Sequence, residues 1–169
     1  MGARKTLGLK ELVAGVIIIT ILDQATKILV RKYIELYASI PVIAGFFDLT
    51  HLQNRGSAFS FMAQSSGQWV RWGFSILAVL AISFISYVYF HLKENENFLK
   101  SGLIMMLGGA VGNLIDRVAL GSVTDFIDMY INGHHWPAYN VADSCISIGA
   151  VIMGIDWFFS AFPPKREVK

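Results

Sequence analysis

The stretch that decides the fold reads GGAVGNLIDRVALGSVTDFIDMYINGHHWPAYNVAD, from residue 108 to residue 143. Asp116 and Arg117 end one long apolar run, Asp143 begins another, and Asp125 lies between them. Ionisable groups are costly inside a lipid bilayer, so those found in or beside membrane-length helices usually have a function. The stretch therefore predicts polar chemistry at the ends of two membrane-spanning helices.

The composition of the whole chain is typical of a membrane protein. Hydrophobic residues make up 54% of the 169 residues and charged residues 15%, and both values depart from soluble proteins in the membrane direction. The length suits a single domain that covers residues 1–169. The net charge of +2 gives no support to a nucleic-acid partner. The one cysteine, Cys145, excludes an internal disulfide bond and is interpreted as a packing residue.

Apolar runs divide the chain into spans and outer segments. The second run is the clearest, since residues 72–91 contain no Asp, Glu, Lys or Arg. In the third run, Gly108 and Gly112 form a small-residue face that is expected to pack inside the monomer. The segment FFDLTHLQNRGSAFSF (residues 46–61) alternates loosely, which predicts strands or a half-buried loop. The predicted spans lie at about residues 12–31, 70–91, 98–116 and 142–162, with outer segments at 32–68 and 117–141.

The basic residues indicate the orientation of the chain. Four spans place both ends of the chain on the same side of the membrane. The two ends and the link between the second and third spans carry most of the Lys and Arg residues, namely Arg4, Lys5, Lys10, Lys93, Lys100, Lys165, Arg166 and Lys169. Because Lys and Arg accumulate on the cytoplasmic side, both ends are predicted to be cytoplasmic.

This topology brings polar residues together on the outer side. Scattered structural groups would not be expected to collect at one depth, so the convergence predicts a site at the outer membrane–water interface. The residues that meet there are Asp23, Asn54, Arg55, Asn113, Asp116, Arg117, Asp125, Asn140 and Asp143. Asp156, toward the inner end of the fourth span, is the deep exception.

Asp125 and Asp143 allow two interpretations. Asp143, together with Asn140, suits the start of a helix, where a carboxylate meets the helix dipole, and Asp125 could be a solvated loop residue. Alternatively, the two carboxylates lie close together and share a proton, because both cannot ionise cheaply. One would then activate water as a base while the other acts as an acid, as in aspartic proteases.

Other polar residues are candidates for supporting roles. Asn113 and Arg117 are spaced i,i+4 on one helix, so both could hold substrate carbonyls or a polar head group. Arg117 could instead pair with Asp116 or extend its side chain to the interface. Asp23 and Lys27 are also spaced i,i+4, so they can pair on one helix face and position the site.

Metal chemistry has little support in the sequence. The zinc-protease pattern H-E-x-x-H does not occur. His134 and His135 are adjacent, so they would not both face one site on a regular strand, and they are interpreted as exposed loop residues. The sequence therefore predicts neither a metal nor a cofactor.

Five ordered motifs give the chain a resemblance to the bacterial lipoprotein signal peptidases, also called type II signal peptidases. The motifs are DQATK (23–27), NRGSAFS (54–60), GGAVGNLIDR (108–117), VTDF (123–126) and YNVAD (139–143). One motif alone would be weak, but five at suitable separations over nearly the whole chain are a strong signal. The resemblance implies an all-α membrane protein of four transmembrane helices with a small extracytoplasmic β-rich cradle and loop.

The resemblance also implies roles for individual residues. Asp125 and Asp143 match the catalytic pair of this family of membrane aspartyl endopeptidases. The positions that match its substrate site are Asn54, Asn113, Arg117 and Asn140. The supporting positions are Asp23, Lys27, Gly56 and Asp116. Arg55 stands where the family commonly has Thr or another residue, so no role is assigned to it.

The implied substrate is a prolipoprotein that carries diacylglycerol on its lipobox cysteine and is cleaved on the amino side of that cysteine, at the bacterial inner (cytoplasmic) membrane. Its scissile bond would lie near the outer leaflet, where carboxylates at helix ends can meet it and the outer segments can limit bulk water. Membrane lipid is a further expected partner, cyclic peptides are expected inhibitors, and a monomer is expected. The aromatic residues that would either clamp the substrate or form the usual interfacial belt are Phe46, Phe47, Phe59, Phe61 and Trp136.

Two other classes of protein compete with the peptidase hypothesis. A proton-coupled transporter or channel subunit could use Asp23, Asp116 and Asp143 as a relay, although these carboxylates cluster at one face instead of crossing the bilayer. A structural membrane scaffold would tolerate alanine at Asp125 and Asp143.

Overall fold

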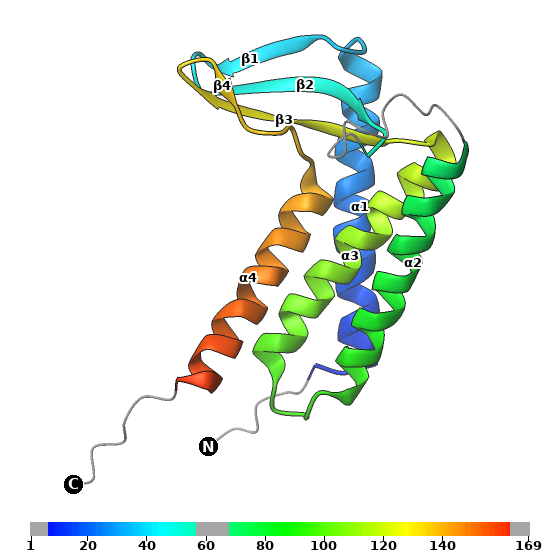
Figure 1. Ribbon diagram of the computed structural model, residues 1–169, viewed down its shortest axis with the longest axis vertical. Helices are drawn as coiled ribbons and strands as arrows, with labels where there is room; N and C mark the ends of the chain where they lie inside the picture. Colours follow the sequence, from blue (N-terminus) through cyan, green and yellow to red (C-terminus); the bar gives the residue numbers. More distant parts are fainter. Residues whose placement is uncertain (1–6, 57–67, 163–169) are drawn as a thin grey trace, which may run out of the picture.

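The computed structural model describes residues 7–56 and 68–162. Within these residues, four long helices and four short strands form (Figure 1). The elements are α1 (Leu9–Tyr33), β1 (Ser39–Ile43), β2 (Phe47–Asn54), α2 (Gln68–His91), α3 (Asn97–Leu120), β3 (Val123–Ile131), β4 (His134–His135) and α4 (Val141–Ala161). All four helices are long and apolar enough to cross a membrane, which confirms the predicted fold of four spans with a small β-rich part.

The central helix of the bundle is α3, which packs against α1, α2 and α4. Its glycines allow this close approach. A Cβ atom on Gly108 would lie 2.7 Å from the Cβ atom of Ile19 in α1, and one on Gly109 would collide with the main-chain oxygen of Ala142 in α4. The predicted face of Gly108 and Gly112 therefore packs against α1 inside the chain, while Gly109, which was not part of the predicted face, allows the approach of α4.

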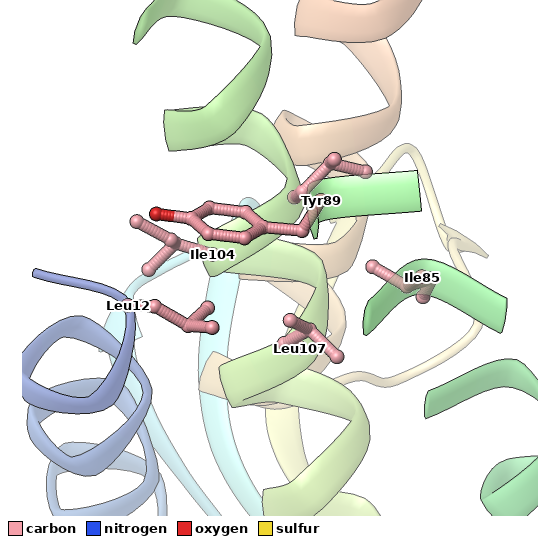
Figure 2. Close-up of a cluster of buried hydrophobic side chains, with 6 residues drawn as sticks. Leu12, Ile85, Tyr89, Ile104 and Leu107 are labelled. Atoms are coloured by element: carbon pink, nitrogen blue, oxygen red, sulfur yellow. The ribbon is translucent and has the colours of Figure 1, made fainter. Parts of the chain in front are cut away.

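An apolar cluster holds α1, α2 and α3 together (Figure 2). Its buried members are Leu12 of α1, Ile85 and Tyr89 of α2, and Leu103, Ile104 and Leu107 of α3. The Tyr89 ring extends toward the beginning of α1, and its hydroxyl donates to the carbonyl oxygens of Leu7 and Gly8 at 3.1 and 3.0 Å. The polar tip of this buried ring is thereby satisfied.

The C-terminal end of α3 lies beyond the predicted span. The helix continues to Leu120, four residues past residue 116, at which the apolar run was predicted to end. Gly121 ends the helix in the left-handed conformation, with a φ of 78°. Arg71 of α2 donates from its Nε atom to the carbonyl oxygen of Arg117 at 3.0 Å and also reaches the carbonyl oxygen of Val118. This contact satisfies carbonyl groups in the extra turn, which the apolar pattern alone does not reveal.

The strands form an antiparallel sheet in the order β1-β2-β3-β4, which lies across one end of the helical bundle (Figure 1). The pairing of β2 with β3 joins the two outer segments, with Leu52 opposite Asp125 and Asn54 opposite Val123. β2 confirms that part of residues 46–61 forms a strand, while residues 57–61 lie outside the described residues. The register thus places Asn54 and Asp125, which are far apart in the sequence, side by side.

Replacing Gly109 with alanine is expected to lower the free energy of unfolding by about 1–3 kcal/mol, because the new methyl group would meet the main chain of α4 at Ala142 as well as the Ile146 side chain, and the main chain cannot move aside cheaply. Thermal unfolding of the purified protein in detergent measures this effect. Gly154→Ala in α4 is the matched control, since a Cβ atom there meets nothing within 4 Å. Equal melting temperatures for the two variants would contradict the close α3–α4 contact.

Candidate active site

The predicted polar residues meet where the sheet covers the bundle, and they come from α1, β2, α3, β3 and α4. Most of them are enclosed by protein. The buried members are Asp23, Lys27, Asn113, Asp116, Asp125 and Asn140. Asn54, Arg117 and Asp143 are half-buried, and Arg55 is exposed. The convergence predicted from topology therefore corresponds to one connected site.

Asp143 lies in the first turn of α4, and Asn140 is the N-cap of this helix. The Oδ1 atom of Asn140 accepts the Asp143 N–H at 3.0 Å, and the Oδ2 atom of Asp143 accepts the Asn140 N–H at 3.2 Å. This reciprocal capping box confirms the helix-start interpretation of the two residues. The cap leaves the Oδ1 atom of Asp143 to accept the Nδ2–H of Asn113 at 2.7 Å, so one carboxylate serves both helix and site.

Asp125 lies on β3 and is only 3% exposed, so the solvated-loop interpretation of this residue is wrong. Its Oδ1 atom accepts the Nδ2–H of Asn140 at 2.7 Å, and its Oδ2 atom accepts that of Asn54 at 3.0 Å. Burial raises the pKa of Asp125 from its ordinary 3.8 to about 6; the Asn54 hydrogen bond opposes this shift, and the charge of Asp143 adds to it.

A single residue, Asn140, contacts both carboxylates. Its side-chain amide donates to Asp125, and its main-chain N–H donates to Asp143. The same Nδ2 atom also contacts the Asn113 Oδ1 atom and the Thr124 carbonyl oxygen, each at 3.3 Å. Asp125 and Asp143, which are remote in the sequence, therefore belong to one hydrogen-bonded network.

A buried ion cluster lies behind this network. The Nζ atom of Lys27 is 2.8 Å from Asp23 Oδ2 and 3.4 Å from Asp116 Oδ2, and it donates to Asn113 Oδ1 at 2.9 Å. The contact between Lys27 and Asp23 is the i,i+4 pair that the sequence predicted within the first span. Lys27 and Asp23 are both 0% exposed, so each charge depends on its partners for stabilisation.

The two carboxylates of the cluster also bind the main chain of other elements. Asp23 of α1 accepts the N–H of Ala142 in α4 at 3.0 Å, and Asp116 of α3 accepts the N–H of Thr124 in β3 at 2.9 Å. Ala142 and Thr124 each immediately precede a candidate catalytic aspartate in the sequence. The cluster therefore ties α4 and β3 to the bundle next to Asp143 and Asp125.

Gly56 and Phe74 complete the site on the side of β2 and α2. Gly56 has a φ of 96°, its N–H donates to the Oδ1 atom of Asn54 at 2.8 Å, and a Cβ atom there would collide with the Phe74 ring. The Arg117 guanidinium lies 5.8 Å from the centroid of the same ring. Within the described residues, the ion pairs of Asp116 go to Lys27 and Arg31, so the alternative pairing with Arg117 is not observed.

A cavity of about 460 Å³ opens beside Asp143. It lies between the sheet and the first turns of α4, and its lining residues are Met129, Trp136, Tyr139, Asp143, Ser144, Ser147 and Ile148. Of the predicted aromatic residues, Trp136 therefore borders the site, whereas Phe59 and Phe61 lie outside the described residues. Asp143 faces open space, while Asp125 is enclosed.

His134 and His135 are exposed, as predicted, but they form the short strand β4, paired with β3, and not a loop. His135 contacts the carboxylate of Asp128 at 2.9 Å through Nδ1 and stacks on Tyr130. In the described part of the chain, no three His, Cys, Asp or Glu side chains are grouped so that they could hold a metal ion.

Among the residues of the site that the sequence did not reveal are Gln24 and Thr124. The Gln24 amide donates to the Gly112 carbonyl oxygen at 3.0 Å and to Asp116 Oδ1 at 3.1 Å, which links α1 to α3. Thr124 supplies both a main-chain N–H and a carbonyl oxygen to the network. The available signal was position, because each is adjacent to an acidic residue of a recognised motif.

Fold and site together define a multi-pass membrane protein with two carboxylates, one buried and one half-buried, that are held by amide groups. Such a pair performs acid–base chemistry in aspartic peptidases. The family model described as signal peptidase (SPase) II matches residues 15–159, and the chain belongs to this family of aspartic peptidases. The family assignment confirms that the chain is an enzyme and removes the transporter and scaffold alternatives.

Individual relatives agree with this assignment. The chain is 47% identical over 137 residues to the lipoprotein signal peptidase of Geobacter sulfurreducens, covering 80% of this chain and 84% of that protein. It is 42% identical over 145 residues to the lipoprotein signal peptidase of Pseudomonas putida, covering 85% and 84%. A bacterial membrane enzyme solved by the in meso method at 1.9 Å resolution is 28% identical, with a TM-score of 0.81 and coverage of 92% of this chain and 97% of that one.

Replacing Asn54 with alanine is expected to raise the pKa of Asp125 above about 6, because the amide hydrogen bond that favours the ionised carboxyl is lost. Infrared difference spectroscopy over a pH titration measures this through the carbonyl stretch of protonated carboxyl groups, with Asp125→Asn assigning the band. Because burial raises the folded-state pKa, Asp125 stabilises the fold below pH 3.8, and this contribution is lost as the pH rises through about 6. Arg55→Ala, at the exposed position next to Asn54, is the control. If Asp125 titrated at the same pH in the Asn54→Ala and Arg55→Ala variants, the prediction would be contradicted.

Proposed function

We propose that the chain is a lipoprotein signal peptidase that removes the signal peptide from prolipoproteins carrying diacylglycerol on the lipobox cysteine, by cleavage on the amino side of that cysteine. The observation that carries this proposal is the network in which Asn140 donates to both Asp125 and Asp143. Family membership and the names of the relatives support the substrate class. An acid–base pair of this kind can activate water without a metal ion.

The surroundings of the two carboxylates favour different protonation states. Asp143 accepts a main-chain N–H at the beginning of α4, where the helix dipole favours negative charge. Asp125 is enclosed on a strand, and burial raises its pKa to about 6. We therefore assign the shared proton to Asp125 and the ionised, base form to Asp143, with the titration belonging to the pair as a whole.

The reaction follows from this assignment. Asp143 removes a proton from water while the water oxygen attacks the scissile carbonyl carbon, and Asp125 gives its proton to the carbonyl oxygen to form a gem-diol. Asp143 then gives its proton to the amide nitrogen, the C–N bond breaks, and a proton returns from the gem-diol to Asp125. The products are a free carboxyl group on the signal peptide and the amine of the lipidated cysteine.

The predicted substrate-binding residues take different parts in this proposal. The Arg117 guanidinium, beside the carboxylates, would hold a substrate carbonyl group. An amide carries two N–H groups, so Asn113 can hold Asp143 with one and the peptide with the other, and Asn54 lies beside Asp125 to bind the same chain. The Nδ2 atom of Asn140 already contacts three acceptors, so its role would be to hold the pair. Asp23, Lys27, Gly56 and Asp116 would support this arrangement.

The placement of the enzyme in its membrane completes the proposal. We place the ends of the chain in the cytoplasm and the site near the outer leaflet of the bacterial inner membrane. The beginning of α1, the link between α2 and α3 and the end of α4 lie at the end of the bundle opposite the sheet, and most of the basic residues stand in or next to these segments in the sequence. The cavity beside Asp143, bordered by Trp136 and Ile148, would receive part of the lipid-modified peptide. We also expect a single catalytic domain over residues 1–169 that acts as a monomer and is inhibited by cyclic peptides that block the two aspartates.

Purified protein is expected to cleave the diacylglyceryl form of a prolipoprotein and to leave the unmodified form intact, because the acyl chains hold the scissile bond at the depth of the site. Gel mobility and mass spectrometry of the products measure cleavage, with a chelator present throughout. Cleavage of neither form by folded protein would contradict the proposed function. Activity that disappears only with the chelator would contradict the metal-independent mechanism.

Asp125→Asn and Asp143→Asn are each expected to abolish cleavage while the protein stays folded, because asparagine keeps the shape of the side chain but can serve neither as the base nor as the proton donor. Single-turnover cleavage and thermal unfolding, measured on the same preparations, separate catalysis from folding. Asp128→Asn, at a half-buried position on the same strand as Asp125, is the matched control and should retain activity. Retained turnover in either site variant would refute the assignment of the pair.

A further inference from the structure

The ammonium group of Lys27 contacts three acceptors, donating hydrogen bonds to two of them and forming an ion pair with Asp116. These acceptors are Asp23 Oδ2, Asn113 Oδ1 and Asp116 Oδ2, at 2.8, 2.9 and 3.4 Å from Nζ. Two of the acceptors are carboxylates and neutralise the buried charge. The third is a neutral amide oxygen, which contributes little to neutralisation, so the contact with Asn113 calls for another explanation.

The polarity of this contact determines which way the Asn113 amide faces. An ammonium group can only donate, so the oxygen of the amide must lie toward Lys27 and its NH₂ group must lie on the other side. There the Nδ2–H donates to Asp143 Oδ1 at 2.7 Å. A reversed amide would place N–H groups against the ammonium and an oxygen against the carboxylate.

We infer that Lys27 is a positioning residue, which acts through Asn113 to keep an N–H directed at Asp143. This inference rests on the proposed catalytic role of the pair. It specifies how Lys27, which is buried and 86 positions from Asn113 in the sequence, supports that role.

The other two asparagines of the site support the inference by contrast. The Oδ1 atoms of Asn54 and Asn140 accept main-chain N–H groups, from Gly56 and Asp143 respectively. Their orientation is therefore built into the backbone. The Oδ1 atom of Asn113 is held by side chains, those of Lys27 and Asn140, so its orientation can be altered by substitution.

A direct electrostatic effect has to be separated from this role. The charge of Lys27 lowers the pKa of Asp125 through space, without any need for Asn113. Other charged groups surround the same network from every packed element: Asp23 and Arg31 on α1, Asp116 and Arg117 on α3, Asp125 on β3 and Asp143 on α4. A change in pH dependence after one substitution would not distinguish the two effects, whereas a double-mutant cycle with Asn113 does.

The experiment is a cycle of Lys27→Met and Asn113→Ala, measured as steady-state cleavage of a diacylglyceryl prolipoprotein. With Asn113 present, Lys27→Met is expected to lower kcat about tenfold or more and to leave KM within about twofold, because the substrate is still bound but the base is misplaced. In the Asn113→Ala background the same substitution is expected to lower kcat by less than about twofold. Equal factors in both backgrounds would overturn the inference.

Folding is controlled by a compensated variant. Lys27→Met leaves Asp23 and Asp116 buried without their cation, so it can fail to fold. The double variant Lys27→Met/Asp23→Asn removes a buried cation and a buried anion together, and the introduced asparagine side chain can still accept the Ala142 N–H. Recovered thermal stability without recovered kcat supports the inference, whereas recovery of both would show that Lys27 only neutralises Asp23. Lys32→Met, the same change at an exposed position of α1, should leave kcat unchanged.

A readout without substrate separates this inference from the proposed function. Infrared titration follows the protonated carboxyl groups of the same four proteins of the cycle. Lys27→Met is expected to move the titration of the pair to higher pH, and to move it further when Asn113 is present, because a reversed amide oxygen would then face Asp143 and favour its protonation. Equal shifts in both backgrounds would overturn the inference. This test needs no substrate, so it stands even if the wild-type protein cleaves no prolipoprotein. Failure to cleave would refute the proposed function alone.

Discussion

The constraint on which the structure depends is the neutralisation of a buried ammonium group. Lys27 is 0% exposed, and its charge is tolerable because Asp23 and Asp116 lie against it. Each of these carboxylates has a second oxygen or lone pair, which accepts a main-chain N–H from α4 or β3. Neutralising one cation therefore joins α1, α3, α4 and β3, and the last two of these elements carry the proposed catalytic pair.

Amide side chains connect this ion cluster to the proposed catalytic pair. Asn54, Asn113 and Asn140 each direct an N–H at an aspartate, and each has its oxygen occupied by a donor on the other side. Hydrogen bonds alone would favour ionisation of both aspartates. Burial opposes this most strongly at Asp125, on a strand, while Asp143 benefits from a helix terminus. Unequal surroundings of this kind give two identical side chains different roles.

The division of the molecule into an apolar and a polar part suits a substrate that is half lipid. The outer faces of the helices carry large exposed apolar side chains, such as Leu80 and Phe159 at 60% and 61% exposure. The polar network lies instead where α1, α3, α4 and β3 meet, and Figure 1 shows the sheet lying across one end of the bundle. Asp23, Asp116 and Asp125 are shielded from bulk water by protein, which strengthens their electrostatic contacts.

Local pattern was enough to predict much of this protein. Apolar runs predict the four spans, the i,i+4 spacing predicts the Asp23–Lys27 pair, and residues 140–143 indicate a helix start, because these features depend on neighbours in the chain. Only the tertiary structure placed Asn54 against Asp125 and Lys27 against Asn113, since these contacts come from strand register and helix packing between remote segments. The last turn of α3 was likewise decided by the tertiary structure, because Arg71 of another helix binds its carbonyl groups.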